Sequence, residues 1–176
     1  MKRIATAVMI FVAVPAMAQA PAANVGVASA KTVWDGMTQN IIKSAEQMPE
    51  SDYAFKPVST VRSFGELIGH VAGAQYMFCA AALGEVPRGE ADVENTVKTK
   101  AGLVDAMKAS TEYCKRAYAQ TDAASAASTK LFGGDVTRMY ALTLNAAHNG
   151  EHYGNIVTYL RIKSMVPPSS QPRAGQ

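Results

Sequence analysis

The chain of 176 residues has a length that fits one compact domain, and 48% of its residues are hydrophobic, enough for one core. Its 17 basic and 14 acidic residues give a net charge of +3 and are scattered, so no basic block supports nucleic-acid binding. The sequence contains neither a P-loop nor a dinucleotide-binding glycine fingerprint, which argues against two large classes of nucleotide-binding enzyme.

The N-terminus has the pattern of a bacterial export signal. Basic residues at positions 2 and 3 precede an apolar run over residues 4–14, and a small-x-small cleavage signal follows at residues 16–18. This pattern predicts a signal peptide over residues 1–18. The apolar run is shorter than the about 20 residues that a membrane-spanning helix needs, so we expect no stable membrane span after cleavage. We therefore expect a periplasmic or secreted protein in oxidising surroundings.

The first predicted helix follows a short linker. Residues 19–28 are mostly small and are expected to form an unstructured linker. Over residues 29–48, apolar side chains then recur at steps of three and four, which is the period of a helix with one buried face. Pro49 marks its end.

A capping pattern marks the start of the second predicted helix. After a connection over residues 50–62, Ser63 and Glu66 have the spacing of a capping box. Apolar residues again recur at helical spacing until Gly84, which is a natural stop for a helix.

Two more helices are predicted in the second half of the chain. A polar connection over residues 85–95 leads to a third helix over about residues 96–120, and residues 121–134 are expected to be a loop. A fourth helix is predicted over about residues 135–164, and the tail at residues 169–176 is expected to be disordered. Alternating strand patterns are missing. The sequence therefore predicts an all-α four-helix bundle over residues 29–168.

The three histidines are the main functional clue. His148 and His152 are four residues apart on the fourth predicted helix, which puts both rings on one face, one turn apart. His70 lies on or beside the buried face of the second helix, so the three rings could share a metal ion in the bundle core. The alternatives are a chance pair of histidines on the fourth helix and a hydrogen-bonded core histidine at position 70.

A second motif overlaps the histidine pair. Residues 148–152 fit H-x-x-E-H, an inverted zinc-protease signature. That site requires a further protein ligand, usually a downstream carboxylate, and no Asp or Glu follows Glu151. We therefore reject the protease interpretation. Glu151 either helps to orient a ligand or is solvated.

Several stretches together resemble the DinB/YfiT-like superfamily of metalloenzymes. The first is SFGELIGHVA at residues 63–72, preceded by YAFKP at residues 53–57. The second is HNGEHYGN at residues 148–155, followed by YLR at residues 159–161 and VPP at residues 166–168. Each motif is weak alone, and the combination is fairly specific.

The resemblance covers about residues 29–168 and implies a four-helix bundle with a metal site made by three histidines. It places one ligand on the second helix at His70 and an H-x-x-x-H pair on the fourth helix at His148 and His152. It also implies the helix order of this family, in which a long crossover makes the second and third helices parallel.

The expected function is binding of one divalent metal ion, with zinc or nickel favoured, although imidazole ligands also suit copper or iron. Some members of the resembled family are thiol-dependent transferases or isomerases. The resemblance therefore implies a transferase or hydrolase that acts on a small-molecule substrate through a metal-activated thiol or water. The alternative is a non-catalytic, stress-associated metal-binding protein of the cell envelope. The sequence leaves open whether the chain forms a homodimer.

Five further residues are candidates for the pocket or for orienting the ligands. They are Glu66, Tyr76, Asn145, Glu151 and Tyr159. The alternative for each is ordinary packing or a surface position, and Glu66 already has a sufficient role in the capping box.

The two cysteines of the sequence indicate whether the second and third predicted helices run parallel or antiparallel. Cys79 and Cys114 lie late in their predicted helices, so antiparallel helices would separate them by about 15–20 Å at a rise of ~1.5 Å per residue. A disulfide needs α-carbons within about 7 Å. Parallel helices would bring the cysteines to the same height, and residues 85–95 are long enough for the return. We therefore predict a disulfide between parallel helices; the alternative is two buried free thiols.

Overall fold

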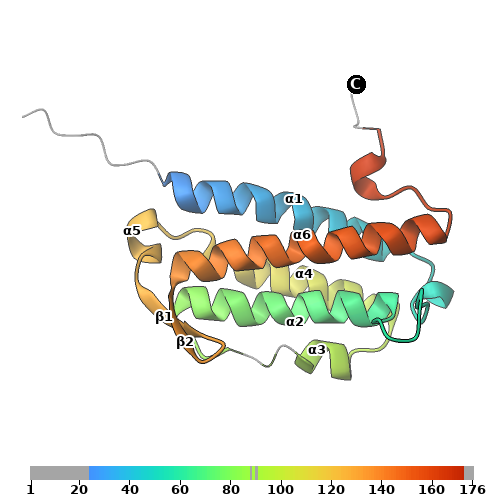
Figure 1. Cartoon of the computed structure of the whole chain (residues 1–176), viewed down its shortest axis with the longest axis horizontal. Helices are drawn as coiled ribbons and strands as arrows, with labels where there is room; N and C mark the ends of the chain where they lie inside the picture. The colour runs from blue at the N-terminus through green and yellow to red at the C-terminus, as the bar shows by residue number, and fades with distance from the viewer. Residues whose placement is uncertain (1–23, 88, 90, 173–176) are drawn as a thin grey trace, which may run out of the picture.

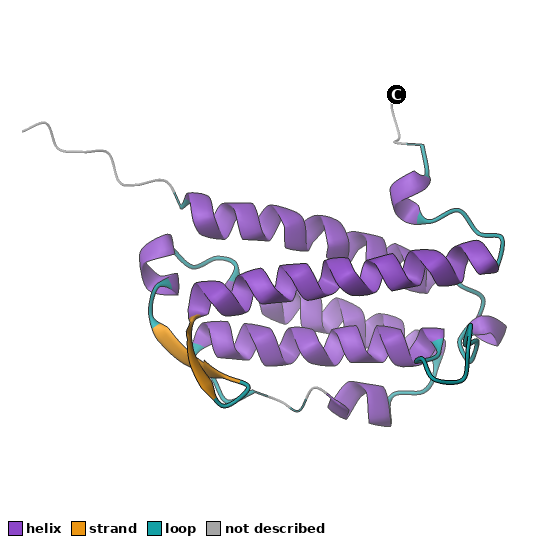
Figure 2. Ribbon diagram, viewed as in Figure 1, coloured by secondary structure: helices purple, strands orange, loops and turns teal. Residues whose placement is uncertain are grey.

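The computed structural model describes residues 24–87, 89 and 91–172, which form a bundle of four long helices (Figure 1). The long helices are α1 (Val25–Gln47), α2 (Phe64–Leu83), α4 (Lys100–Ala117) and α6 (Arg138–Ile162). The connecting elements are η1 (Glu50–Asp52), α3 (Ala91–Thr96), α5 (Asp122–Ser125), β1 (Ser128–Leu131), β2 (Gly134–Thr137) and η2 (Pro168–Ser170). The predicted four-helix bundle is confirmed (Figure 2). The predicted signal peptide at residues 1–18 lies outside the described residues.

Helices α2 and α4 run in the same direction. Gly69, early in α2, lies against the side chain of Leu103, early in α4. Further along both helices, the side chain of Gln75 donates a hydrogen bond to Ser110 at 2.9 Å. The crossover between the two helices contains α3 and packs closely on α2. A Cβ atom at Gly69 would lie only 2.9 Å from the α-carbon of Glu94, so this approach requires a glycine.

The two cysteines lie at the same height between these helices. Their sulfur atoms are at disulfide distance, and their α-carbons are 5.3 Å apart. Both side chains are fully buried. This is the placement that parallel helices were predicted to give.

Helix α1 starts earlier than predicted, at Val25, within the expected linker at residues 19–28. Its cap comes from a distant part of the chain. The carboxylate of Asp122 accepts hydrogen bonds from the backbone of Gly26 at 2.9 Å and of Val27 at 2.8 Å, and these bonds lower the pKa of Asp122. The side chain of Asn24 in turn accepts a hydrogen bond from the backbone N–H of Asp122 at 3.0 Å. Local sequence contains no sign of a cap supplied 96 residues away.

The third helix is shorter than predicted, and the polar connection predicted over residues 85–95 contains most of the short helix α3. Helix α3 ends at Thr96 and α4 begins at Lys100, where the Thr99 side chain accepts a hydrogen bond from the backbone of Gly102 at 3.2 Å. Helix α4 then ends at Ala117 rather than near residue 120. The threonine cap ends the crossover and starts α4.

The prediction of a loop over residues 121–134 is wrong in part, because this segment contains the short helix α5 and most of a β-hairpin. Strands β1 and β2 pair antiparallel, and Leu131 is opposite Gly134. The two turn residues, Phe132 and Gly133, have φ angles of 51° and 80°, as a type I′ turn requires. Each strand has only four residues, too few for a visible alternating pattern. The fourth helix therefore begins at Arg138, later than predicted.

The predicted disordered tail at residues 169–176 is partly ordered. The element η2 packs back on α6, where the hydroxyl of Tyr153 donates to the Ser169 hydroxyl at 2.8 Å and accepts from the Ser169 backbone at 2.9 Å. Residues 173–176 lie outside the described part of the chain. None of the helices in the described part is long and apolar enough to cross a membrane.

A buried polar network crosses the core and joins all four long helices. Trp34 in α1 donates to the carbonyl of the Gln75 side chain in α2 at 2.7 Å, and Gln75 in turn donates to Ser110 in α4. Asn149 in α6 donates to the same Gln75 oxygen at 3.3 Å and to Thr38 in α1 at 3.0 Å. Because buried polar groups must keep their partners, this network fixes how α6 sits against α2.

Candidate metal centre

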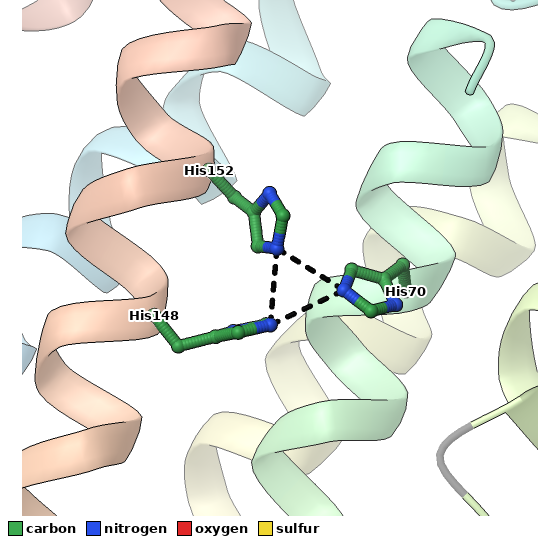
Figure 3. Close-up of side chains that lie close together, drawn as sticks. All are labelled: His70, His148 and His152. Carbon is green, nitrogen blue, oxygen red and sulfur yellow. Dashed lines mark hydrogen bonds between the residues drawn. The ribbon is translucent and has the colours of Figure 1, made fainter. Parts of the chain in front are cut away.

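The three histidines meet between α2 and α6. His70 projects from α2, and His148 and His152 project from successive turns of α6 (Figure 3). The Nε2 atom of His70 lies 3.2 Å from that of His148 and 3.1 Å from that of His152. The Nε2 atoms of His148 and His152 are 3.0 Å apart. The sequence prediction that these residues could share a site therefore agrees with their positions.

Hydrogen bonding cannot satisfy this triangle. A neutral imidazole nitrogen either carries a proton and donates or has a lone pair and accepts. With three Nε2 atoms in mutual contact, at least one pair must place two lone pairs or two N–H groups face to face. One cation at the centre satisfies all three lone pairs at once.

The donor set fits a divalent transition metal. Zinc binds imidazole nitrogen at about 2.0–2.1 Å, and a tetrahedral arrangement at that distance separates the nitrogens by about 3.3–3.4 Å. The observed separations of 3.0–3.2 Å are only slightly shorter. Among the described residues, His70, His148 and His152 form a cluster of potential ligands that is large enough and close enough to hold an ion. Three histidines leave a fourth tetrahedral position for a small ligand.

The protein surroundings keep the imidazoles neutral, which metal binding requires. Burial, followed by the charge of Arg62, lowers the pKa of His70 to about 4. Burial also lowers the pKa of His148 to about 3, with further contributions from His152, His70 and Arg62. The pKa of His152 is lowered as well, again mainly by burial.

The Nδ1 atoms of His70 and His152 lie next to other polar groups. Nδ1 of His70 lies 3.6 Å from a carboxylate oxygen of Glu94 in α3. Nδ1 of His152 lies 3.3 Å from the side-chain amide of Asn155. The Nδ1 atom of His148 is buried and has no hydrogen-bond partner among the described residues. Such contacts orient ligating rings and fix which nitrogen faces the metal.

An open groove of about 760 Å³ is lined by His152, one of the three histidines. Its wall is formed by the connection before α2, the start of α2, the second half of α6 and Glu94 of the crossover. The lining residues are Lys56, Pro57, Ser59, Thr60, Val61, Arg62, Glu66, Leu67, Glu94, His152, Asn155, Thr158 and Tyr159. Two ion pairs lie along it, Lys56–Glu66 and Arg62–Glu94, each at 2.9 Å.

Two of the five candidate pocket residues line this groove. Glu66 completes the capping box predicted from the sequence, accepting from the Ser63 backbone at 2.7 Å. That bond and the nearby Lys56 lower its pKa to about 2. The hydroxyl of Tyr159 donates to the backbone carbonyl of Arg62 at 2.6 Å and so holds the groove wall in place.

The other three candidates lie elsewhere. Asn145 is buried against the cysteine pair, with its amide 3.3 Å from the sulfur of Cys79. The ring of Tyr76 contacts the ring of Tyr113. Glu151 is exposed, and its charge raises the pKa of His152, against the effect of burial.

The polar groove residues that were not predicted from the sequence include Lys56, Arg62, Glu94 and Asn155. Glu94 reaches the site only because the crossover folds back on α2, and no local pattern shows this. Asn155 has a visible signal, since it lies one helical turn after His152 on the same face.

The sequence comparison identifies the family. A family model described as the DinB superfamily matches residues 34–156. The chain belongs to the DinB superfamily. None of the curated proteins matches it in sequence.

Solved structures share the fold of this DinB-superfamily chain. A DinB-like protein from Bacillus cereus superposes with a TM-score of 0.69 at 13% identity, over 80% of this chain and 95% of that one. The DinB-like protein YjoA from Bacillus subtilis has a TM-score of 0.65 at 24% identity, over 82% and 99%. YfiT from Bacillus subtilis, described as "a probable metal-dependent hydrolase with an unusual four-helix bundle topology", has a TM-score of 0.62 at 12% identity, over 89% and 95%.

A mycothiol-dependent maleylpyruvate isomerase shares the fold over a smaller part of its length. Its TM-score is 0.61 at 14% identity, and the match covers 76% of this chain and 65% of that chain. The fold of the DinB-superfamily bundle therefore occurs in proteins described with different chemistries.

Proposed function

We propose that this DinB-superfamily protein is an exported metal-dependent enzyme that holds one divalent ion, zinc or nickel, with His70, His148 and His152. The reaction is transfer to, or hydrolysis of, a small-molecule substrate. The observation that carries the proposal is the triangle of Nε2 atoms, which hydrogen bonding cannot satisfy and a cation can.

When bound, a divalent ion supplies Lewis acidity that lowers the pKa of a thiol or water at its open position. The residues of the chain bind and orient around it. The contact of Glu94 with Nδ1 of His70 turns Nε2 of that ring toward the site. The open groove that His152 lines gives a small substrate access from solvent.

Both carboxylates of the groove are engaged in other contacts, which supports a role for the metal, rather than a carboxylate, in activating the nucleophile. Glu66 has a pKa of about 2 and is therefore a weak base. Glu94 is paired with Arg62 and faces His70. No other acidic side chain among the described residues lines this groove. The same observation favours a second candidate, a non-catalytic metal-binding protein of the cell envelope.

Export is supported by the signal-like N-terminus and by the cysteine pair at disulfide distance, since such pairs persist in oxidising compartments. The proposed location is the bacterial periplasm or exterior.

The experiment uses mature protein purified without a histidine tag, stripped with a chelator and reloaded with zinc, nickel or cobalt. Each form is assayed for ester hydrolysis and for thiol transfer to an electrophile. We expect activity that is lost on stripping, returns with metal and is absent in His148→Ala. The exposed Glu151→Gln variant serves as a control for expression and folding. A protein that binds metal but is inactive throughout the panel would favour the non-catalytic candidate.

A further inference from the structure

We propose that Arg62 determines the specificity of the groove by binding a carboxylate group of the substrate, so that the substrates are small carboxylic acids. This inference rests on the proposed function, because the substrate is taken to reach a metal ion held by the three histidines. It adds the chemical class of the substrate and a residue that recognises it.

Arg62 is held in position by its backbone and one nitrogen of its side chain. Its carbonyl accepts the hydrogen bond from Tyr159 at 2.6 Å, and it directly precedes Ser63, the N-cap of α2. Its Nε donates to Glu94 at 2.9 Å. The two terminal nitrogens of the guanidinium have no hydrogen-bond partner among the described residues, and the side chain is 44% exposed. Arg62 therefore keeps free donors on the groove wall.

The charge balance of the groove favours an anionic substrate. Among the described lining residues, the charges of Lys56 and Arg62 cancel those of Glu66 and Glu94. Three neutral imidazoles contribute no negative charge, so a divalent ion would leave the site with two uncompensated positive charges. A deprotonated thiol or water compensates one of them. An anionic group elsewhere on the substrate compensates the other.

Arg62 suits this role better than Lys56. Arg62 lines the same groove as His152, and its Nε is bonded to Glu94, whose other carboxylate oxygen lies 3.6 Å from Nδ1 of His70. The ammonium of Lys56 is already bonded to the carboxylate of Glu66. A guanidinium also offers paired donors that match the two oxygens of a carboxylate.

The test uses the protein loaded with cobalt and two thiols of matched size, 3-mercaptopropionate and 2-mercaptoethanol. Both can bind the metal through sulfur, and only the first has a carboxylate. Their dissociation constants are measured from the absorbance of the cobalt–sulfur bond in wild-type protein, in Arg62→Gln and in Lys56→Gln. Cobalt content and helix content are measured for each variant.

We expect 3-mercaptopropionate to bind at least about tenfold more tightly than 2-mercaptoethanol to wild-type protein. Arg62→Gln should reduce this preference by about tenfold and leave the affinity for 2-mercaptoethanol nearly unchanged, whereas Lys56→Gln should retain it. The comparison across variants corrects for any direct contact of the carboxylate with cobalt.

Retention of the preference in Arg62→Gln would overturn the assignment. An equal loss in both variants would also overturn it, because the effect would then be one of net charge. If the wild-type protein binds cobalt and both thiols with equal affinity, the carboxylate inference fails and the metal site stands. If it binds no cobalt, the proposed function fails and the inference fails with it.

Discussion

The Nε2 atoms of His70 and His152 lie 3.1 Å apart, although the two residues are 82 positions apart in the sequence. The contact joins α2 to α6. A metal ion bound here would cross-link the two helices in the folded state, and the unfolded chain would offer no such site.

The first prediction is that metal binding stabilises the fold. A ligand that binds only the folded state at a hundredfold excess over its dissociation constant adds about 2.7 kcal/mol to the free energy of unfolding. Zinc should therefore raise the denaturant midpoint of the stripped protein, and a chelator should reverse the change. His148→Ala should unfold at the same midpoint with and without zinc. Equal shifts in wild type and variant would indicate that zinc binds elsewhere.

The second prediction concerns Cys79 and Cys114. Mass spectrometry of unreduced, alkylated protein recovered from the periplasm should find the two joined. In the chain-entropy model, closing a loop with a sequence separation of 35 stabilises by roughly 3–4 kcal/mol, so the Cys79→Ala/Cys114→Ala double variant should lose about that much. Two freely alkylated cysteines would contradict the pairing.

The third prediction is a pH dependence from Glu66. Its pKa in the folded protein, about 2, is below the ordinary value of 4.5, because the Ser63 backbone and Lys56 stabilise the carboxylate. Its contribution to stability is therefore complete above pH 4.5 and is lost as the pH falls toward 2. Glu66→Gln should melt at a lower temperature than wild type at pH 7, and the difference should shrink below pH 4.5. A difference that does not depend on pH would assign the effect to packing.

The fourth prediction compares two helix ends. Gly84 after α2 and Ser164 after α6 both have left-handed backbones, with φ of 73° and 58°, and both helices close with the same pair of backbone hydrogen bonds. Ser164→Gly should stabilise the protein by about 0.5–1 kcal/mol, because glycine adopts this conformation without strain.

Gly84→Ala should destabilise by about 1 kcal/mol or more, since its Cβ would also approach the guanidinium of Arg138. Chemical denaturation of both variants measures the changes. Opposite signs to those stated would mean that the two helix ends are not equivalent.

The helices and the histidines were predictable because their signals are local. Steps of three and four, the Ser63–Glu66 capping box and the spacing of His148 and His152 are all contained within one helix each. The position of His70 opposite the pair needed the family resemblance as well, because no local rule aligns two separate helices.

The rest depended on contacts between distant segments. The start of α1 requires Asp122, and the groove requires Glu94 from the crossover next to Arg62 from the connection before α2. The hairpin was missed because its four-residue strands are too short for a periodic signal and its turn has Phe132 where asparagine or glycine is usual.

Metal analysis of mature protein purified without a histidine tag tests the central claim most directly. We predict about one divalent ion per chain in the wild type. We also predict greatly reduced occupancy in His148→Ala and in His152→Ala, with helix content nearly intact by circular dichroism. Full metal occupancy in both single variants would contradict the assignment of the site.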